Sequence, residues 1–470
     1  MTKETKLLKN TAIIGIGNIC TKCISFFMLP LYTSILTTVQ YGTVDLIATY
    51  SSLLMIILTL QFEQGVFRYL VEFREDETKQ KEYISVAILT VIIITIVFSI
   101  IGSVILSVVG YKYTIFFIGT SSIGAINAVF LQIPRGLGNN AVYAFGSLLS
   151  GSTNVLLNVL FVAILHYGVN GVLIASLLSL CICLIYVCIR LKLWQWVKRS
   201  IFSMECLKKL LRYSLPLVPY TLCWWIISAS DRMLISRFLG TSFNGIYAAA
   251  YKFPSLFSMV TNIFQLSWTE SASENINDDN RDEFYNNVFN KTIRFYSSAN
   301  MGIICLMPFL FNFLIGDAFK DTYYYIPILL CAALFHSIAA LYGSLYFAFK
   351  ETKKISTTTM LAAAINFIVN FALIQFVGLY AAAGSSLIAY FIITIIRHYD
   401  IQSMVKIIIS RKYIIIECFM YLIVLFSYYL MNWVIEIVVL AIIIPYCCIQ
   451  NKDFFSSIFK MSQKVFMRKN

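Results

Sequence analysis

Apolar runs of about 20 residues recur along almost the whole chain, and a helix of that length crosses roughly 30 Å of hydrocarbon. Hydrophobic residues make up 59% of the 470 positions and charged residues only 13%, a composition that a water-soluble domain does not have. We therefore predict an all-α polytopic membrane protein. Its spans are expected near residues 10–35, 43–67, 83–109, 113–134, 141–165, 169–190, 213–238, 244–268, 292–315, 324–349, 356–377, 379–397, 413–430 and 432–450, about fourteen in all.

The basic residues predict the orientation. When alternate connections are assigned to alternate sides, thirty of the 36 Lys and Arg residues fall on one side, whereas Lys112 and Lys320 fall on the other. Because Lys and Arg in short loops are retained in the cytoplasm, we expect a multi-pass protein of the cytoplasmic (inner) membrane with both termini in the cytoplasm. This bias also explains the net charge of +13, so we expect no nucleic-acid partner.

The sequence carries little that indicates an enzyme. It has no phosphate-binding loop of the GxxxxGK[ST] type, its three histidines lie in separate segments, and most of its 12 cysteines lie inside predicted spans. We expect reduced cysteines that serve as packing residues. Every predicted outer connection is only a few residues long, which leaves no room for a catalytic loop. We therefore expect no catalytic residue, metal or cofactor, and a function that resides within the helix bundle.

An internal repeat divides the chain. The segments 36–42 and 239–245 share Leu, Thr and Gly at one offset, and an Asn-x-x-x-Asn pair at Asn154 and Asn158 recurs at Asn366 and Asn370. Many transporters consist of duplicated halves. We predict two six-helix bundles related by a parallel repeat, at residues 1–200 and 201–400, followed at 401–470 by two extra membrane helices and a cytoplasmic tail. Each asparagine pair is interpreted as an interhelical hydrogen-bond clamp.

These features together resemble the polysaccharide transport branch of the MOP superfamily, the Wzx-type flippases of O-antigen and capsule repeat units. The resemblance covers the whole chain and rests on the asparagine pairs and on Leu8-Lys9-Asn10, Leu29-Pro30-Leu31-Tyr32, Gln40-Tyr41-Gly42, Arg68-Tyr69, Ser230-Asp231-Arg232 and Gly245-Ile246-Tyr247. It implies two bundles that alternate between cytoplasmic and outer access. It further implies outward transport of an undecaprenyl-pyrophosphate-linked oligosaccharide, coupled to a proton or sodium gradient. The implied partners are membrane lipids, the polymerase and other polysaccharide assembly proteins.

Charges within the spans are the candidate substrate-binding or translocation residues, because a charge at the bilayer centre costs about 2.5–3.5 kcal/mol on insertion scales. Lys22 lies near the middle of the first span, and Asp231 and Lys252 lie near the outer ends of neighbouring spans, where they could pair. Arg232 is rotated by about 100° from Asp231. Glu63 lies in the inner part of the second span, where it could bind a driving proton or cation. Arg68 could equally neutralise Glu63.

Two sets of residues are predicted to allow bending: Pro216 and Pro219 at the start of the seventh span, and Gly15 and Gly17 in the first. Arg135 and Glu270, at inner mouths, are expected to be solvated charges. Two transport alternatives remain open, a MATE-type cation-coupled antiporter of drugs or small molecules and a lipid II flippase. A membrane glycan-modifying enzyme is a weaker third alternative, because it would need a sizeable outer loop and the predicted outer connections are short.

Overall fold

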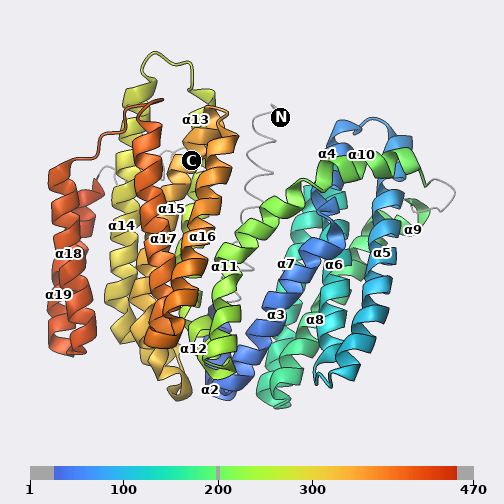
Figure 1. Cartoon of the computed structure of the whole chain (residues 1–470), viewed down its shortest axis with the longest axis horizontal. Helices are drawn as coiled ribbons and strands as arrows, with labels where there is room; N and C mark the ends of the chain where they lie inside the picture. The colour runs from blue at the N-terminus through green and yellow to red at the C-terminus, as the bar shows by residue number, and fades with distance from the viewer. Residues whose placement is uncertain (1–25, 197–201, 453–470) are drawn as a thin grey trace, which may run out of the picture. The chain divides into compact units, whose positions relative to one another are not determined.

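The computed structural model describes residues 26–196 and 202–452, and in this part of the chain helices alternate with short loops (Figure 1). Eleven of these helices are long and apolar enough to cross a membrane, which confirms the all-α membrane class. The predicted total of fourteen includes a first span that lies mostly outside the described residues. The chain packs as two compact units that meet in sequence at Ala248 and Ala249. The predicted domain limits near residues 200 and 400 stay a prediction.

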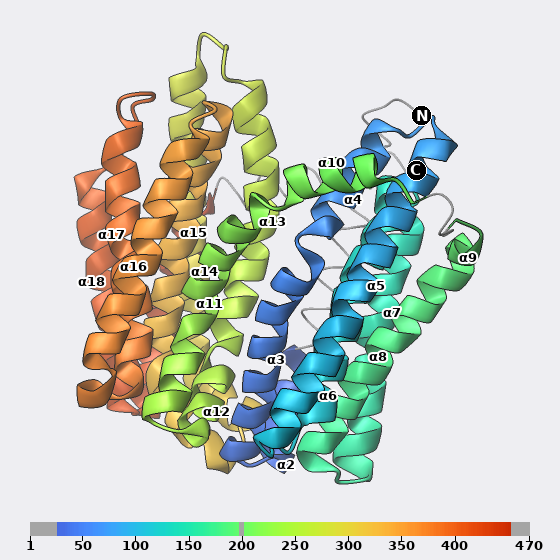
Figure 2. The same cartoon turned by 45° about the vertical axis from the view of Figure 1, so that its right-hand side comes forward.

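The first unit contains long helices that run side by side in both views (Figures 1 and 2). In chain order its elements are α2 (Leu29–Ile35), α3 (Thr38–Thr59), α4 (Phe62–Glu72), α5 (Glu77–Val108), α6 (Thr114–Gly136), α7 (Asn140–Asn158), a π-helical turn (Val159–Ile164), α8 (Gly168–Leu191), α9 (Leu193–Trp196), α10 (Met204–Ser214), α11 (Leu217–Phe238) and α12 (Thr241–Ala250). The boundary between the units falls near the end of α12.

The predicted second span is broken where α3 ends and α4 begins. Leu60 and Gln61 both have left-handed backbone conformations, with φ of 49° and 59°, which costs roughly 1–2 kcal/mol per non-glycine residue. The backbone N–H of Gln61 donates to the Thr59 hydroxyl at 3.2 Å, and the Gln61 side chain is buried. Residues 62–67 of this predicted span therefore belong to a separate helix, which the uninterrupted apolar run did not predict.

Helix α10 lies across the end of the first unit, next to α4 (Figure 1). Its buried residues are Cys206, Leu210 and Ser214, and a Cβ on Gly65 of α4 would lie 2.4 Å from the Ser214 hydroxyl. This close approach requires glycine. The packing completes a core in which buried side chains of α4, α5, α6, α8 and α10 meet.

The second unit also consists of packed helices. They are α13 (Lys252–Glu274), α14 (Arg281–Leu314), a 3₁₀ segment (Asp317–Tyr325), α15 (Ile326–Ala348), α16 (Thr352–Val377), α17 (Leu379–Ile401), α18 (Arg411–Leu430) and α19 (Trp433–Gln450). Helix α15 is the most enclosed, with 72% of its most apolar window buried, and it packs against α13, α16 and α17.

The two C-terminal helices pack on α14 and on each other. An extended segment leads into them, and α14 holds it by two asparagine side chains. The Ile408 backbone N–H donates to Asn286 Oδ1 at 2.7 Å, and Asn290 Nδ2 donates to the Ile408 carbonyl at 3.0 Å. The linker and the helices that follow it are thus tied to one helix of the second unit.

The repeated asparagine pairs act as the predicted clamps. In the first unit, Asn154 Nδ2 of α7 approaches the hydroxyls of Ser176 and Ser179 on α8 at 3.4 and 3.3 Å. In the second, Asn366 Nδ2 of α16 donates to the hydroxyls of Ser385 and Ser386 on α17 at 3.3 and 3.0 Å. The first asparagine of each pair thus joins two consecutive helices, as polar side chains do between membrane helices, whereas Asn158 Nδ2 donates to Asn154 within α7.

Candidate functional site

The two copies of the repeated Thr-x-x-x-Gly sequence pack directly against each other. A Cβ on Gly42 of α3 would lie 2.0 Å from the Thr241 carbonyl oxygen, and a Cβ on Gly245 of α12 would lie 2.0 Å from the Thr38 carbonyl oxygen. The hydroxyls of Thr38 and Ser242 lie 2.7 Å apart. We call this crossing of Thr38 and Gly42 with Thr241 and Gly245 the glycine contact. Only glycine permits backbones to approach so closely.

An ion pair lies beside the glycine contact. Arg232 Nε of α11 lies 3.0 Å from Asp45 Oδ2 of α3, and the two side chains are 14% and 22% exposed. Asn244 Nδ2 of α12 donates to the same Asp45 oxygen at 3.2 Å and to the Gly42 carbonyl at 3.1 Å. Because the group is mostly shielded from solvent, its attraction is screened less than that of a surface pair. Three helices are thus joined through one carboxylate.

Asp231 and Arg232 use different partners, as their angular separation on α11 predicts. Asp231 is buried and accepts a hydrogen bond from the Tyr247 hydroxyl of α12 at 2.9 Å. Lys252, its suggested partner, is half-buried at the first residue of α13 in the second unit. Asp231 therefore fastens α11 to α12, whereas Arg232 fastens α11 to α3.

Helix α11 meets α3 at two further polar contacts, so that the two helices lie side by side (Figure 2). Trp225 Nε1 donates to the Ser52 hydroxyl at 2.9 Å, and the Thr221 hydroxyl donates to Gln61 Oε1 at 3.1 Å. The α11 residues of these contacts lie four positions apart and share one face of the helix. The contact of Thr221 falls on the left-handed break between α3 and α4.

Glu63 lies in the first turn of α4, two residues after this break. Its Oε2 atom is buried and has no hydrogen-bond partner among the described residues. The suggested neutralising partner, Arg68, instead lies 3.9 Å from Glu72, with both side chains largely exposed. The alternative in which Arg68 neutralises Glu63 is therefore wrong, because Arg68 turns toward solvent and its i,i+4 neighbour.

A cavity of about 590 Å³ lies along a polar face of α13 in the second unit. It is lined by Asn262, Gln265, Thr269, Glu270 and Ser273 of this helix and by Phe347 of α15. The spacing of the five polar residues places them on one side of the helix. The volume lies in the range of small-molecule sites. Gln265 Nε2 and the Thr269 hydroxyl already donate to Ala340 and Ser344 of α15, and the amide and hydroxyl oxygens can still accept hydrogen bonds from a hydroxyl-rich ligand. Glu270 is exposed, as expected, but it lines this cavity.

The proline and glycine predictions have separate outcomes. Pro216 is the N-cap residue of α11 and Pro219 lies in its first turn, where proline is compatible with a helix. They therefore mark the junction between α10 and α11 and do not interrupt the span. Gly15, Gly17 and Lys22 lie outside the described residues.

Sequence reasoning missed several residues of these sites. Asp45 is the one acidic residue in α3, and such a charge in an apolar run was a usable signal. The polar face of α13 was also visible as a helical periodicity. Arg135 was expected to be solvated, but it stacks on the Phe67 ring, with its guanidinium carbon 4.4 Å from the ring centroid. The neighbours of Arg135 could not be read from the sequence.

Comparison with known proteins gives the family and the fold. The model of the family described as "Polysaccharide biosynthesis protein" matches residues 7–269. An inward-facing MATE multidrug resistance transporter of the MOP superfamily is 16% identical, with a TM-score of 0.68 over 86% of this chain and 99% of that one.

The lipid II flippase MurJ, in an inward closed conformation, is 15% identical, with a TM-score of 0.70 over 95% of this chain and 100% of that one. No curated protein gives a significant match. The structural likenesses establish the fold that this chain shares with MATE and MurJ. The family match covers more than half of the sequence, and the chain belongs to the polysaccharide biosynthesis protein family.

Proposed function

We propose that this protein is a flippase that moves an undecaprenyl-pyrophosphate-linked oligosaccharide, such as an O-antigen or capsule repeat unit, from the cytoplasmic to the outer leaflet by alternating access. The observation that carries the proposal is the match to a polysaccharide biosynthesis family on a chain with a transporter fold. A fold of this kind offers a path across the membrane, and the family supplies the class of cargo.

The cavity along α13 supports a glycan cargo. Four of its five polar residues carry amides or hydroxyls, which exchange hydrogen bonds with sugar hydroxyls without a net charge. A polar headgroup in hydrocarbon must recover the hydrogen bonds that it loses from water. The α13 face can supply such bonds while the lipid tail remains in the bilayer. The bilayer, polymerase and other polysaccharide assembly proteins are proposed as partners.

The distribution of basic residues supports a location in the inner membrane with both termini in the cytoplasm. The glycine contact then lies at the outer ends of α3 and α12. We propose that this contact and the Asp45–Arg232 pair form an outer gate, which opens when the glycan is released. Opening of this gate has to break the contacts of Thr38 with Ser242, of Asn244 with Gly42 and of Arg232 with Asp45. Because these contacts are few, the free energy that separates the closed and open states is modest.

Rescue of surface polysaccharide in cells that lack their own repeat-unit flippase tests the proposal. We expect the wild type to rescue, and Gln265→Leu to rescue less at equal membrane expression. Lys22→Ala tests the predicted cation in the first span, and Lys320→Ala is the control, since Lys320 is largely exposed. Absence of rescue by the wild type, in a host where flippases for related repeat units do rescue, would refute the proposal.

Glu270 in the cavity favours one alternative, a cation-coupled antiporter, since a carboxylate attracts cationic compounds. The same cells distinguish the antiporter from the flippase, because an antiporter would lower the accumulation of a cationic dye without restoring polysaccharide. A lipid II flippase would instead support growth after depletion of the host's own lipid II flippase.

A further inference from the structure

A second polar site lies in the three-helix group formed by α14, α18 and α19 of the second unit. Glu417 of α18 is 7% exposed. Tyr413, Tyr446 and Gln450 surround its carboxylate, yet neither carboxylate oxygen receives a hydrogen bond of acceptable geometry within the described part of the chain. Burial without such a bond disfavours the charged form of a carboxylate.

The neighbours of Glu417 offer both hydroxyl donors, on Tyr413 and Tyr446, and an acceptor, on Gln450. Gln450 Nε2 donates to the Tyr446 hydroxyl oxygen, which leaves Gln450 Oε1 as the free atom of the amide. That oxygen and the Tyr413 hydroxyl oxygen are buried without hydrogen-bond partners in the described residues. A proton on Glu417 would give Gln450 Oε1 a donor, whereas the Tyr413 and Tyr446 hydroxyls can donate to the charged carboxylate. The site can thus hold the carboxyl group in either form.

A nearby positive charge also acts on this carboxyl group. The Arg294 guanidinium of α14 lies over the Tyr413 ring, 5.4 Å from its centroid, and acts on the charge of Glu417. The other titratable groups that act on this carboxyl or feel its charge are Tyr413, Tyr421, Tyr446 and Cys447. Burial favours the neutral form of Glu417 and Arg294 favours the charged form. A small movement of α14 against α18 would therefore shift the balance between the two.

The site lies close to one end of the group. Glu417 follows the first residue of α18 by six positions, about 9 Å along the helix, and Gln450 is the last residue of α19. The positive-inside rule places this end in the cytoplasm. Arg294 is exposed there, so water can reach the neighbourhood of the carboxyl group.

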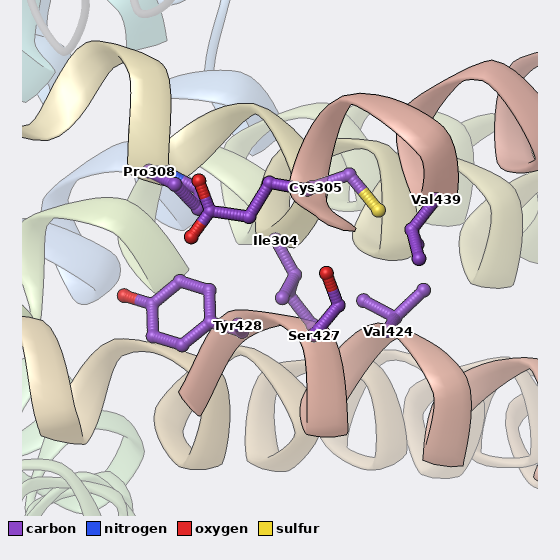
Figure 3. Close-up of a pocket in the computed structure, with 8 residues that line it drawn as sticks. Ile304, Cys305, Pro308, Val424, Ser427, Tyr428 and Val439 are labelled. Atoms are coloured by element: carbon purple, nitrogen blue, oxygen red, sulfur yellow. The ribbon is translucent and has the colours of Figure 1, made fainter. Parts of the chain in front are cut away.

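A seam of polar atoms leads from this site toward the other end of the group. The Tyr421 hydroxyl donates to the Ser297 carbonyl at 3.2 Å and to Asn300 Oδ1 at 3.3 Å. Beyond them Cys305, Ser427 and Tyr428 surround a small cavity of about 10 Å³ (Figure 3), which a second buried carboxylate, Glu436, also lines. That volume is close to the space that one water molecule needs.

We propose that Glu417 reversibly binds a proton during the transport cycle, so that the α14–α18–α19 group is where the protein couples to the proton gradient. In this step a proton from the aqueous phase bonds to a carboxylate oxygen of Glu417, and the same O–H bond breaks when the proton leaves. The coupling part rests on the proposed flippase function. Proton binding itself does not, and it is measured separately.

Labelling with dicyclohexylcarbodiimide tests proton binding without any substrate, because this reagent modifies protonated carboxyl groups in apolar surroundings. Purified full-length protein in phospholipid vesicles is labelled over a range of pH, and the Glu417 peptide is quantified by mass spectrometry. We expect labelling that falls as pH rises and that is absent in the nearly isosteric Glu417→Gln. Glu436→Gln, the same change in the same helix group, should leave Glu417 labelling unchanged.

Three labelling results would overturn the proposal: no modification of Glu417 at any pH, modification that does not depend on pH, or loss of Glu417 modification in Glu436→Gln. The coupling is tested by polysaccharide rescue, which Glu417→Gln should lose and Glu417→Asp should retain. Full rescue by Glu417→Gln would overturn the coupling. If the wild type does not rescue, the flippase proposal fails, while the labelling still decides whether Glu417 binds a proton.

Discussion

Replacing Gly42 by alanine should open the glycine contact. The new Cβ would lie 2.0 Å from the Thr241 carbonyl oxygen and 2.8 Å from the Gly245 nitrogen, whereas ordinary contacts begin at 3.4 Å. The ends of α3 and α12 must therefore separate by more than an ångström. Both obstacles are backbone atoms, so a side-chain rotation cannot relieve the clash.

The separation would break two hydrogen bonds, from Asn244 to the Gly42 carbonyl and between Thr38 and Ser242. At about 0.5–1.5 kcal/mol each, their loss destabilises the closed contact by roughly 1–3 kcal/mol. That range corresponds to a change of about 5- to 150-fold in the ratio of closed to open protein. Gly245→Ala should have an effect of the same size, since its Cβ meets the Thr38 carbonyl oxygen at the same 2.0 Å.

Disulfide cross-linking measures this population. The Thr38 and Ser242 hydroxyls are 2.7 Å apart, so cysteines at both positions lie within bonding reach, and the joined peptide identifies the product among the native thiols. The two cysteines already remove the bond between Thr38 and Ser242, so only the bond from Asn244 remains to be lost, and we expect Gly42→Ala to slow cross-linking by about 2- to 12-fold. Gly302→Ala is the matched control, because no atom lies within 4 Å of its added Cβ. Unchanged cross-linking in Gly42→Ala would refute the steric argument.

Three more predictions follow from single contacts. Asp45→Asn and Arg232→Gln should each lower polysaccharide rescue, and the double variant should lose less than the sum of the two, because either change already breaks the pair; additive losses would contradict a direct interaction. Gln265→Asn should retain more rescue than Gln265→Leu at equal expression, since the asparagine keeps an amide in the cavity; equal rescue would remove Gln265 from the cargo path. Burial raises the pKa of the Cys206 thiol, so its alkylation by N-ethylmaleimide should be slow at neutral pH and accelerate as pH rises and thiolate forms; fast, pH-independent alkylation would show that Cys206 is not buried.

The fold could be predicted because membrane spans depend on length and hydrophobicity, which a sequence displays directly. Predicted spans such as 413–430 differ from the observed helix Arg411–Leu430 by a residue or two. The break at Leu60 and Gln61 could not be foreseen; at this break Gln61 accepts a hydrogen bond from Thr221, which lies 160 residues away. Hydropathy does not contain such pairings.

The candidate site was only partly visible for the same reason. Asp231 and Arg232 were identified because a charge inside a span is costly, but their partners Tyr247 and Asp45 come from other helices. Glu417 was not selected, since one glutamate near a span end is indistinguishable from a solvated one. Its significance depends on burial, which the packing of α14 and α19 against α18 creates.

The glycine contact also bears on how the chain arose. Thr38 faces Gly245 while Thr241 faces Gly42, so each repeat presents the same patch to the other, as the subunits of an isologous dimer do. A half-length ancestor with this patch would have paired with itself about a two-fold axis. After fusion, residues away from the axis were free to diverge. Asp45 corresponds to Ala248 in the other repeat and Arg232 corresponds to Leu29, so the pair of Asp45 with Arg232 has no counterpart. At the axis itself both copies still carry glycine.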